Sequence, residues 1–305
     1  MTGSERGSYA FLVNPASGAG AASAAVVPVA RALREAGAQV EVVYSRGPRQ
    51  VLGEVDAAGA RGDVVVSVGG DGMLSSVAGQ VAVRGGTLGL LPAGRGNDFA
   101  RMLGLETDPA SVAQVLLAGT TRSVDLLRVI RATGAVDVVV SSVYAGVDAV
   151  AGRIVDRVRW LPGRLQYPYA ALHALATYRP VRAHVEVDGV AHTFTAATVV
   201  VANSAYYGSG MRIAPSAQVD DGLLDVLVIE AASRHGLIRA LPKVYDGAHV
   251  ELGEVHVLRG RSVRLHGSPG APMGGDGEPL DPLPTATQDA VRVEVWEGAL
   301  QVLAP

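Results

Sequence analysis

Two short glycine-rich loops that carry aspartate, each directly after an apolar run, are the residues best suited to chemistry. The first is Gly69-Gly70-Asp71-Gly72 after residues 64–68, and the second is Gly94-Arg95-Gly96-Asn97-Asp98, which follows residues 88–91. Glycine lets a backbone approach a phosphate chain closely. A carboxylate in such a loop repels bare phosphate, which favours Mg²⁺ between the two. The loops therefore predict a site for phosphate and its metal ion.

Two further loops have related features. Asn14-Pro15 and Ser17-Gly18 stand between the apolar run 10–13 and an alanine-rich helical stretch, and Ser45 ends the apolar run 40–44. Strand, glycine-containing turn and helix in this order place helix N-terminal N–H groups where a phosphate can face them. Taken alone, this motif favours the simpler interpretation that Gly18 and Gly20 are only turn residues. Asn97 and Asp98 also have an alternative, because one of them would suit the N-cap of the following helix.

The elements that must position these loops alternate between strand and helix in the first part of the chain. Apolar runs at residues 10–13, 40–44, 64–68 and 88–91 are separated by helical stretches. This order predicts an α/β fold with a Rossmann-like parallel sheet, whose ligand crevice lies outside the carboxyl ends of the strands. Ser17, Ser45, Asp71 and Asn97 all fall at such ends.

From residue 123 the pattern changes to short strands, which predict a C-terminal β-sandwich. Two helices are expected among them, at residues 165–178 and 234–246. The expected strands are residues 124–131, 136–143, 183–187, 196–202, 223–229, 256–258 and 262–265. We therefore place a nucleotide-binding α/β domain at residues 1–121 and a β-sandwich domain at residues 122–289.

The second part carries two clusters of carboxylates. In the segment Gln218-Val219-Asp220-Asp221-Gly222-Leu223, aspartates and backbone carbonyls suit a hard cation; a hairpin turn explains the Asp-Gly pair as well. In Asp276-Gly277-Glu278, either carboxylate could take a proton from a hydroxyl, and either could be an ordinary turn residue.

Composition excludes several classes of protein. The chain has 305 residues, 49% of them hydrophobic, a net charge of -3 and no cysteine. Nucleic acid is therefore not an expected partner, and disulfides and thiolate metal sites are absent. With neither a signal peptide nor a membrane-spanning run expected, we predict a cytoplasmic protein. The segment 160–169 mixes aromatics, arginine and leucine, which suits either contact with a bilayer or a core helix.

Together these motifs resemble the diacylglycerol kinase catalytic-domain family, in particular its bacterial soluble lipid kinases, with sphingosine kinases and NAD kinases as distant relatives. The resemblance rests on Asn14-Pro15 with Ser17-Gly18, the Gly69–Gly72 loop, residues 94–101, residues 215–223 and Asp276-Gly277-Glu278. The chain departs from the family pattern at Met73, Ser75, Ser76 and Arg95, where threonine, an Asn-Glu pair and a second threonine are usual.

The resemblance implies ATP in a cleft between the two domains, a Mg²⁺ requirement, and the return of residues 290–305 to the first domain. It implies that Asp276, or alternatively Glu278, is the general base, and that Asp221 with the carbonyls of Gln218 and Leu223 holds a structural Mg²⁺. The residues expected around ATP are Asn14, Pro15, Ser17, Gly18, Ser45, Gly69, Gly70, Asp71, Gly72, Met73, Ser75, Gly94, Arg95, Asn97 and Asp98.

The expected function is transfer of the ATP γ-phosphoryl group to a lipid hydroxyl, with diacylglycerol as acceptor and phosphatidic acid as product. Expected partners are ATP, the lipid, and transiently the inner face of the membrane; a homodimer is one candidate assembly. Two alternatives stay open, a nucleotide-binding protein without kinase activity and a kinase for a sphingoid or soluble acceptor.

Overall fold

The computed structural model describes residues 7–15, 17–45, 47–158 and 160–305, and it divides into two compact units. The first comprises residues 1–124 and 298–305, and the second comprises residues 125–297. The chain passes between them in two strands, β5 (Thr121–Ile130) and β15 (Val291–Leu303). The expected fold class, a parallel-sheet α/β domain followed by a β-sandwich domain, is confirmed.

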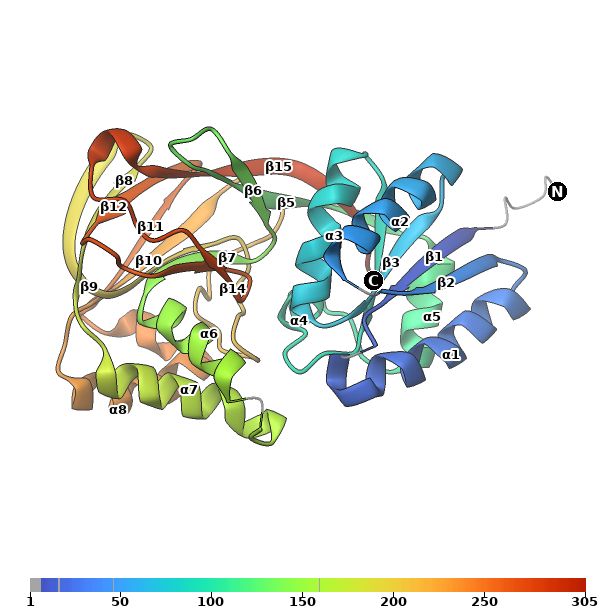
Figure 1. Cartoon of the computed structure of the whole chain (residues 1–305), viewed down its shortest axis with the longest axis horizontal. Coiled ribbons are helices and arrows are strands. Elements are labelled where there is room, and N and C mark those ends of the chain that lie inside the picture. Colours follow the sequence, from blue (N-terminus) through green and yellow to red (C-terminus); the bar gives the residue numbers. More distant parts are fainter. Residues whose placement is uncertain (1–6, 16, 46, 159) are drawn as a thin grey trace. The chain divides into compact units, whose positions relative to one another are not determined.

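The first unit alternates strands and helices around a parallel sheet (Figure 1). Strands β4, β3, β1 and β2 are hydrogen-bonded neighbours in that order, all parallel, and the end of β15 adds a further parallel strand beside β4. The elements are β1 (Ser8–Val13), η1 (Ser17–Gly20), α1 (Ala21–Glu35), β2 (Gln39–Tyr44), α2 (Pro48–Arg61), β3 (Val64–Gly69), α3 (Asp71–Val83), β4 (Thr87–Pro92), α4 (Asp98–Met102) and α5 (Pro109–Ala118).

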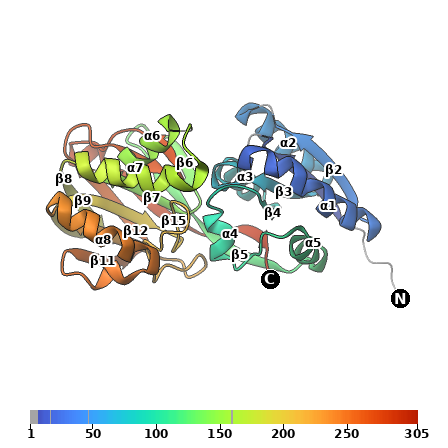
Figure 2. The ribbon, with the colours of Figure 1, turned by 90° about the horizontal axis from the view of Figure 1, so that it is seen from below.

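Helices cover both faces of this sheet. Helix α1 packs against α5, and α2 packs against α3; the two pairs lie on opposite faces (Figures 1 and 2). Strands β1, β3 and β4 are buried almost throughout, and their side chains fill a core with Phe11, Leu33 and Leu91. Burial on both faces explains why these strands read as continuous apolar runs.

The second unit is antiparallel in every strand pair that its described residues form within it. Its long strand β9 pairs with β7, β8 and β10. The elements are β6 (Val136–Val139), β7 (Ser142–Gly146), α6 (Val147–Arg157), α7 (Gly163–Thr177), β8 (Val181–Val187), β9 (Val190–Ala202), β10 (Leu224–Glu230), α8 (Arg234–Asp246), η2 (Ala248–Glu251), β11 (Val255–Gly260), β12 (Ser262–Gly267), β13 (Met273–Gly275), β14 (Glu278–Leu280) and η3 (Thr287–Asp289).

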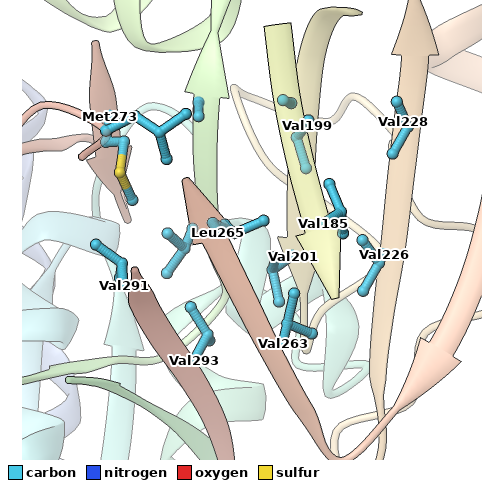
Figure 3. Close-up of a cluster of buried hydrophobic side chains, with 14 of the residues drawn as sticks. Val185, Val199, Val201, Val226, Val228, Val263, Leu265, Met273, Val291 and Val293 are labelled. Atoms are coloured by element: carbon cyan, nitrogen blue, oxygen red, sulfur yellow. The ribbon is translucent and has the colours of Figure 1, made fainter. Parts of the chain in front are cut away.

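Valine and leucine side chains from these strands meet in one core (Figure 3). Val185, Val201, Val226 and Val263 are each at most 1% exposed. Helices α6, α7 and α8 cover one side of the strands (Figures 1 and 2). Within the described ranges, no helix is both long and apolar enough to cross a membrane.

Two sequence-based predictions for this unit were wrong. The single strand expected at residues 136–143 is two strands, because the backbone N–H groups of Val140, Ser141 and Ser142 donate to the Asp276 carboxylate. Helix α6 was not expected at all. Its apolar residues continue directly from the apolar strand β7, so the change from strand to helix periodicity is hidden at Gly146.

Candidate functional site

The direction in which strands are added to the sheet of the first unit reverses between β1 and β3. Strand β1 is followed through α1 by β2 on one side, and the chain then returns through α2 to β3 on the other side. Ligands of open α/β sheets bind at such a reversal, outside the carboxyl ends of the strands. Asn14 and Gly70 follow β1 and β3 directly. The loop after β4 lies beside them, since β3 and β4 are hydrogen-bonded neighbours.

The glycine loops at these strand ends touch one another. A Cβ atom added to Gly94 would lie 2.2 Å from the Cα of Gly70, and one added to Gly18 would lie 2.4 Å from the carbonyl oxygen of Ala93. A Cβ at Gly69 would lie 3.0 Å from the Ser17 Oγ. Only glycine fits such backbone contacts. The structure therefore brings together three of the four predicted loops, those after β1, β3 and β4.

Hydrogen bonds fix the positions of these loops. The Asn14 N–H donates to the carbonyl of Val68 at 3.1 Å, and the Ala93 N–H donates to the carbonyl of Gly69 at 2.8 Å. The fourth loop is attached to β1, because the Ser45 N–H donates to the carbonyl of Val13. All four loops thus end on the same edge of the sheet.

Asn97 and Asp71 hold the loop after β4 from two sides. The Asn97 Oδ1 accepts the Gly94 N–H at 2.9 Å, and its Nδ2 donates to the Gly94 carbonyl at 3.2 Å. Asn97 occupies the N-cap position of α4 with φ of 52°, yet its side chain makes no capping bond. The Asp71 Oδ1 instead accepts the Phe99 N–H in the first turn of α4 at 3.3 Å. Asn97 thus closes its own loop, and Asp71 ties the loop after β3 to the first turn of α4.

A small hollow with a volume of about 20 Å³ lies at this edge, with Gly69, Gly70, Asp71, Pro92 and Asn97 among its lining residues. Helix α3 begins here at Asp71, so the positive end of its dipole is at the hollow.

The other residues predicted to surround the nucleotide differ in how exposed they are. Met73 is only 7% exposed and belongs to the core. The Ser75 Oγ donates to the Asp71 carbonyl at 3.0 Å. Arg95 and Pro15 are exposed, Ser45 is half-buried, and Asp98 is buried with its Oδ1 4.0 Å from the Arg101 Nε.

In the second unit, Asp276 and Gly277 form the turn between β13 and β14. Both have positive φ, 49° and 90°, as a two-residue turn of the I′ type requires. The Asp276 carboxylate accepts three backbone N–H groups, from Val140 at 2.6 Å, Ser141 at 2.8 Å and Ser142 at 3.2 Å. Glu278, the alternative base, is exposed.

The turn between β8 and β9 repeats this arrangement. Asp188 and Gly189 also have positive φ, 47° and 86°. The Asp188 carboxylate accepts the N–H groups of Arg261 and Ser262 at 3.0 and 2.9 Å. Anchoring by backbone N–H groups is therefore a structural device of this unit and does not by itself identify a base.

A phenol distinguishes the Asp276 turn. The Tyr144 hydroxyl accepts the Gly277 N–H at 3.0 Å. Burial raises the pKa of Tyr144, against the lowering effect of that hydrogen bond, so the phenol stays neutral near pH 7. Asp148 lies in the same region: its carboxylate accepts hydrogen bonds from Tyr207 at 3.0 Å and Thr198 at 2.5 Å, and burial raises its pKa.

Asp221, the predicted metal ligand, is committed to other partners. Its Oδ1 accepts the Leu223 N–H at 3.0 Å, and its Oδ2 pairs with the Arg259 guanidinium. The Arg259 Nε also lies 3.3 Å from the buried Asp225 carboxylate. Burial lowers the pKa of Arg259, but the two carboxylates outweigh that effect and raise it.

A cation bound at Asp221 would therefore have to displace the Arg259 guanidinium. Across the described ranges, no three carboxylate or imidazole groups converge as a metal would need, and a guanidinium occupies the position beside Asp221. The prediction of a metal at Gln218, Asp221 and Leu223 stays untested, and we derive no step through a cation there.

Sequence reasoning overlooked two buried residues that connect the loops of this unit. The Asn203 Nδ2 donates to the carbonyls of Asp125 and Val140, and the Asp125 Oδ2 accepts the Gly222 N–H at 2.8 Å. Val140 in turn donates to Asp276. The sequence does show a lone carboxylate, Asp125, inside an apolar strand, where a charged residue is rare unless it is paired. Nothing in the sequence around Arg259 indicates that it pairs with Asp221.

Comparison with known proteins assigns both parts of the chain. Residues 8–129 match the family model of the diacylglycerol kinase catalytic domain, and residues 141–304 match that of the YegS C-terminal NAD kinase beta sandwich-like domain. The chain is 34% identical to a diacylglycerol kinase of Mycobacterium tuberculosis over 304 residues, 99% of this chain and 96% of the relative.

Two further proteins are similar to this chain at lower identity. The chain is 24% identical to a diacylglycerol kinase of Bacillus subtilis over 226 residues, 71% of each chain. In fold it is similar to a crystal structure described as a putative diacylglycerol kinase from Bacillus anthracis, with a TM-score of 0.76, 18% identity and 98% of each chain covered.

We expect Gly94→Ala to destabilise the first unit, because its Cβ would overlap the Gly70 Cα and neither backbone can move without breaking strand-end hydrogen bonds. The loss should be about 1–3 kcal/mol in the free energy of unfolding, measured by urea denaturation. Gly53→Ala is the matched control, since its Cβ meets nothing within 4 Å and alanine favours the helix by about 0.5–1 kcal/mol. Equal stability of the two variants would contradict the contact.

We expect Arg259→Gln to lower the melting temperature, because it leaves the buried Asp225 carboxylate without its cation. The cost should be about 1–3 kcal/mol. Arg261→Gln, which removes an exposed ion pair with Glu297, is the control and should cost less than about 1 kcal/mol.

If the Arg259 guanidinium occupies the position beside Asp221, the melting temperature of the wild-type protein should be the same in Mg²⁺ and in EDTA. A higher melting temperature in Mg²⁺ would instead support the predicted metal site at Gln218, Asp221 and Leu223.

Proposed function

Since this chain belongs to the diacylglycerol kinase family of lipid kinases, we propose that it transfers the ATP γ-phosphoryl group to the hydroxyl of diacylglycerol, which yields phosphatidic acid. The observation that carries the proposal is the contact of three glycine-containing loops at the carboxyl ends of β1, β3 and β4. Their backbones leave no room for side chains, as a cradle for phosphates requires.

The proposed nucleotide site uses backbone groups and the start of α3. The N–H groups in the first turn of a helix have no partner within the helix, and its dipole favours phosphate there. Mg²⁺ carried with ATP would neutralise further charge, and the half-exposed Asp71 would face it. Arg95 is exposed after β4, where its guanidinium would pair with phosphate oxygens. The single lysine of the chain, Lys243, lies in α8 of the second unit.

The proposed base is Asp276. The hydroxyl oxygen of the acceptor attacks the γ-phosphorus, the bond from that phosphorus to the bridging oxygen breaks, and ADP leaves with the electron pair. The hydroxyl proton passes to the Asp276 carboxylate. Three backbone N–H groups fix the orientation of this carboxylate, as backbone N–H groups also do at Asp188; the Asp276 turn differs in its contact with the buried Tyr144 hydroxyl, which accepts the Gly277 N–H. Because the acceptor is a lipid, the enzyme must also meet a bilayer for part of its cycle.

Incubation of the protein with labelled ATP, Mg²⁺ and a mixed lipid extract tests this function. We expect the label in phosphatidic acid, identified by chromatography against a standard. Label in a phosphorylated sphingoid base or in a soluble product would instead identify a different acceptor. ATP binding without labelled product would favour a nucleotide-binding protein.

We expect Asp276→Asn to slow phosphorylation by at least about 100-fold, because proton transfer by a positioned base contributes that much. ATP affinity should be unchanged. Asparagine also weakens the bonds to Val140, Ser141 and Ser142, so the melting temperature must be measured beside the rate.

Asp188→Asn is the matched structural control for this variant, since it alters the same kind of aspartate-glycine turn. It should lose stability in a similar way and keep its activity. If Glu278→Gln abolished the rate and Asp276→Asn did not, Glu278 would be the base.

A further inference from the structure

Helix α7 carries an exposed apolar face that takes no part in the sites described above. Leu165, Tyr169 and Leu172 recur at intervals of four and three residues, so they lie on one side of the helix. Their exposed fractions are 47%, 44% and 45%, and Trp160, just before the helix, is 77% exposed. Figure 2, which views the second unit from below, shows α7 in front of the strands.

This outward face is additional to the face that packs in the core. Ala174, Leu175 and the following Tyr178 join a buried cluster with residues of α6, β9 and α8, and α7 packs against both helices. A helix that is apolar on both sides is normally buried on both. The outward face of α7 therefore has the composition of a contact surface.

The sequence around α7 is rich in arginine. Residues 153–182 contain six arginines and one carboxylate, in a chain whose net charge is -3. Arg153, Arg157, Arg179 and Arg182 have exposed side chains. Such a segment attracts a negatively charged surface. A second copy of the same segment would be repelled, which argues against this face as a dimer contact.

We propose that the outward face of α7 and the exposed arginines Arg153, Arg157, Arg179 and Arg182 form the docking surface for an anionic bilayer, with Trp160, Leu165, Tyr169 and Leu172 inserted among the acyl chains. Leucine and aromatic side chains beside arginines are the composition of helices that lie in a membrane interface. Tryptophan favours that depth because its ring is apolar and its N–H is polar. The inference rests on the proposed function in that it names where a lipid kinase meets its lipid.

Tryptophan fluorescence tests the docking surface without ATP or diacylglycerol. The chain has two tryptophans, and Trp296 lies under the Arg128 guanidinium at 4.1 Å, so Trp296→Phe leaves Trp160 as the only reporter. Vesicles of phosphatidylglycerol and phosphatidylcholine should shift its emission to shorter wavelength. Binding should be at least about tenfold tighter than to pure phosphatidylcholine, because each basic residue near an anionic surface adds attraction. Unchanged emission with anionic vesicles would overturn the proposal.

The combined variant Leu165→Gln, Tyr169→Gln and Leu172→Gln should lose at least about tenfold in vesicle affinity, measured by cosedimentation. Val136→Gln, Val190→Gln and Val257→Gln together are the control, because these side chains of the same unit are equally exposed, by 51%, 60% and 40%. Equal affinity of the two variants would also overturn the proposal.

The docking surface and the kinase function can fail separately. If the protein phosphorylates short-chain diacylglycerol but does not bind vesicles, only the docking surface is refuted. If it binds vesicles but labels no lipid, only the kinase function is refuted.

Discussion

The contact between the backbones of Gly70 and Gly94 is the constraint on which the first unit depends. The loops after β3 and β4 can meet only because neither residue has a Cβ atom. That meeting brings Asp71 within reach of the first turn of α4 and lets Asn97 close its own loop. The carboxyl ends of the parallel strands thus form one edge of backbone groups, and the phosphate site we propose consists of that edge.

In the second unit, carboxylates take the organising role that close glycine contacts have in the first. Asp125, Asp188 and Asp276 each accept backbone N–H groups from a different segment. Buried N–H groups must find acceptors, and a charged acceptor makes a stronger bond than a carbonyl. The hydrogen bonds from Val140, Ser141 and Ser142 to Asp276 also separate β6 from β7. The same three bonds therefore set the boundary between these strands and the orientation of the proposed base.

Local signals explain which features were predictable from the sequence. Composition alone predicts the strands at residues 64–68 and 88–91 and the glycine loops after them. The alternation of strands and helices then predicts that these loops lie at the same edge of a parallel sheet. The pairing of Arg259 with Asp221 joins residues 38 positions apart, and the split at Val140 depends on Asp276, 136 positions away. No local pattern encodes such contacts. Helix α6 was missed because its apolar residues extend the apolar strand before it.

The residues that depart from the family pattern bear on the phosphate site that we propose. Met73 turns its side chain into the core, and the hydroxyls of Ser75 and Ser76 donate to carbonyls one turn earlier in α3. Side-chain hydroxyls are thus directed to the helix itself. The phosphate site that we propose would then rely on backbone N–H groups, the helix dipole, Arg95 and the Mg²⁺ carried with ATP. Backbone donors act only at close range, which accounts for loops packed too tightly for any side chain.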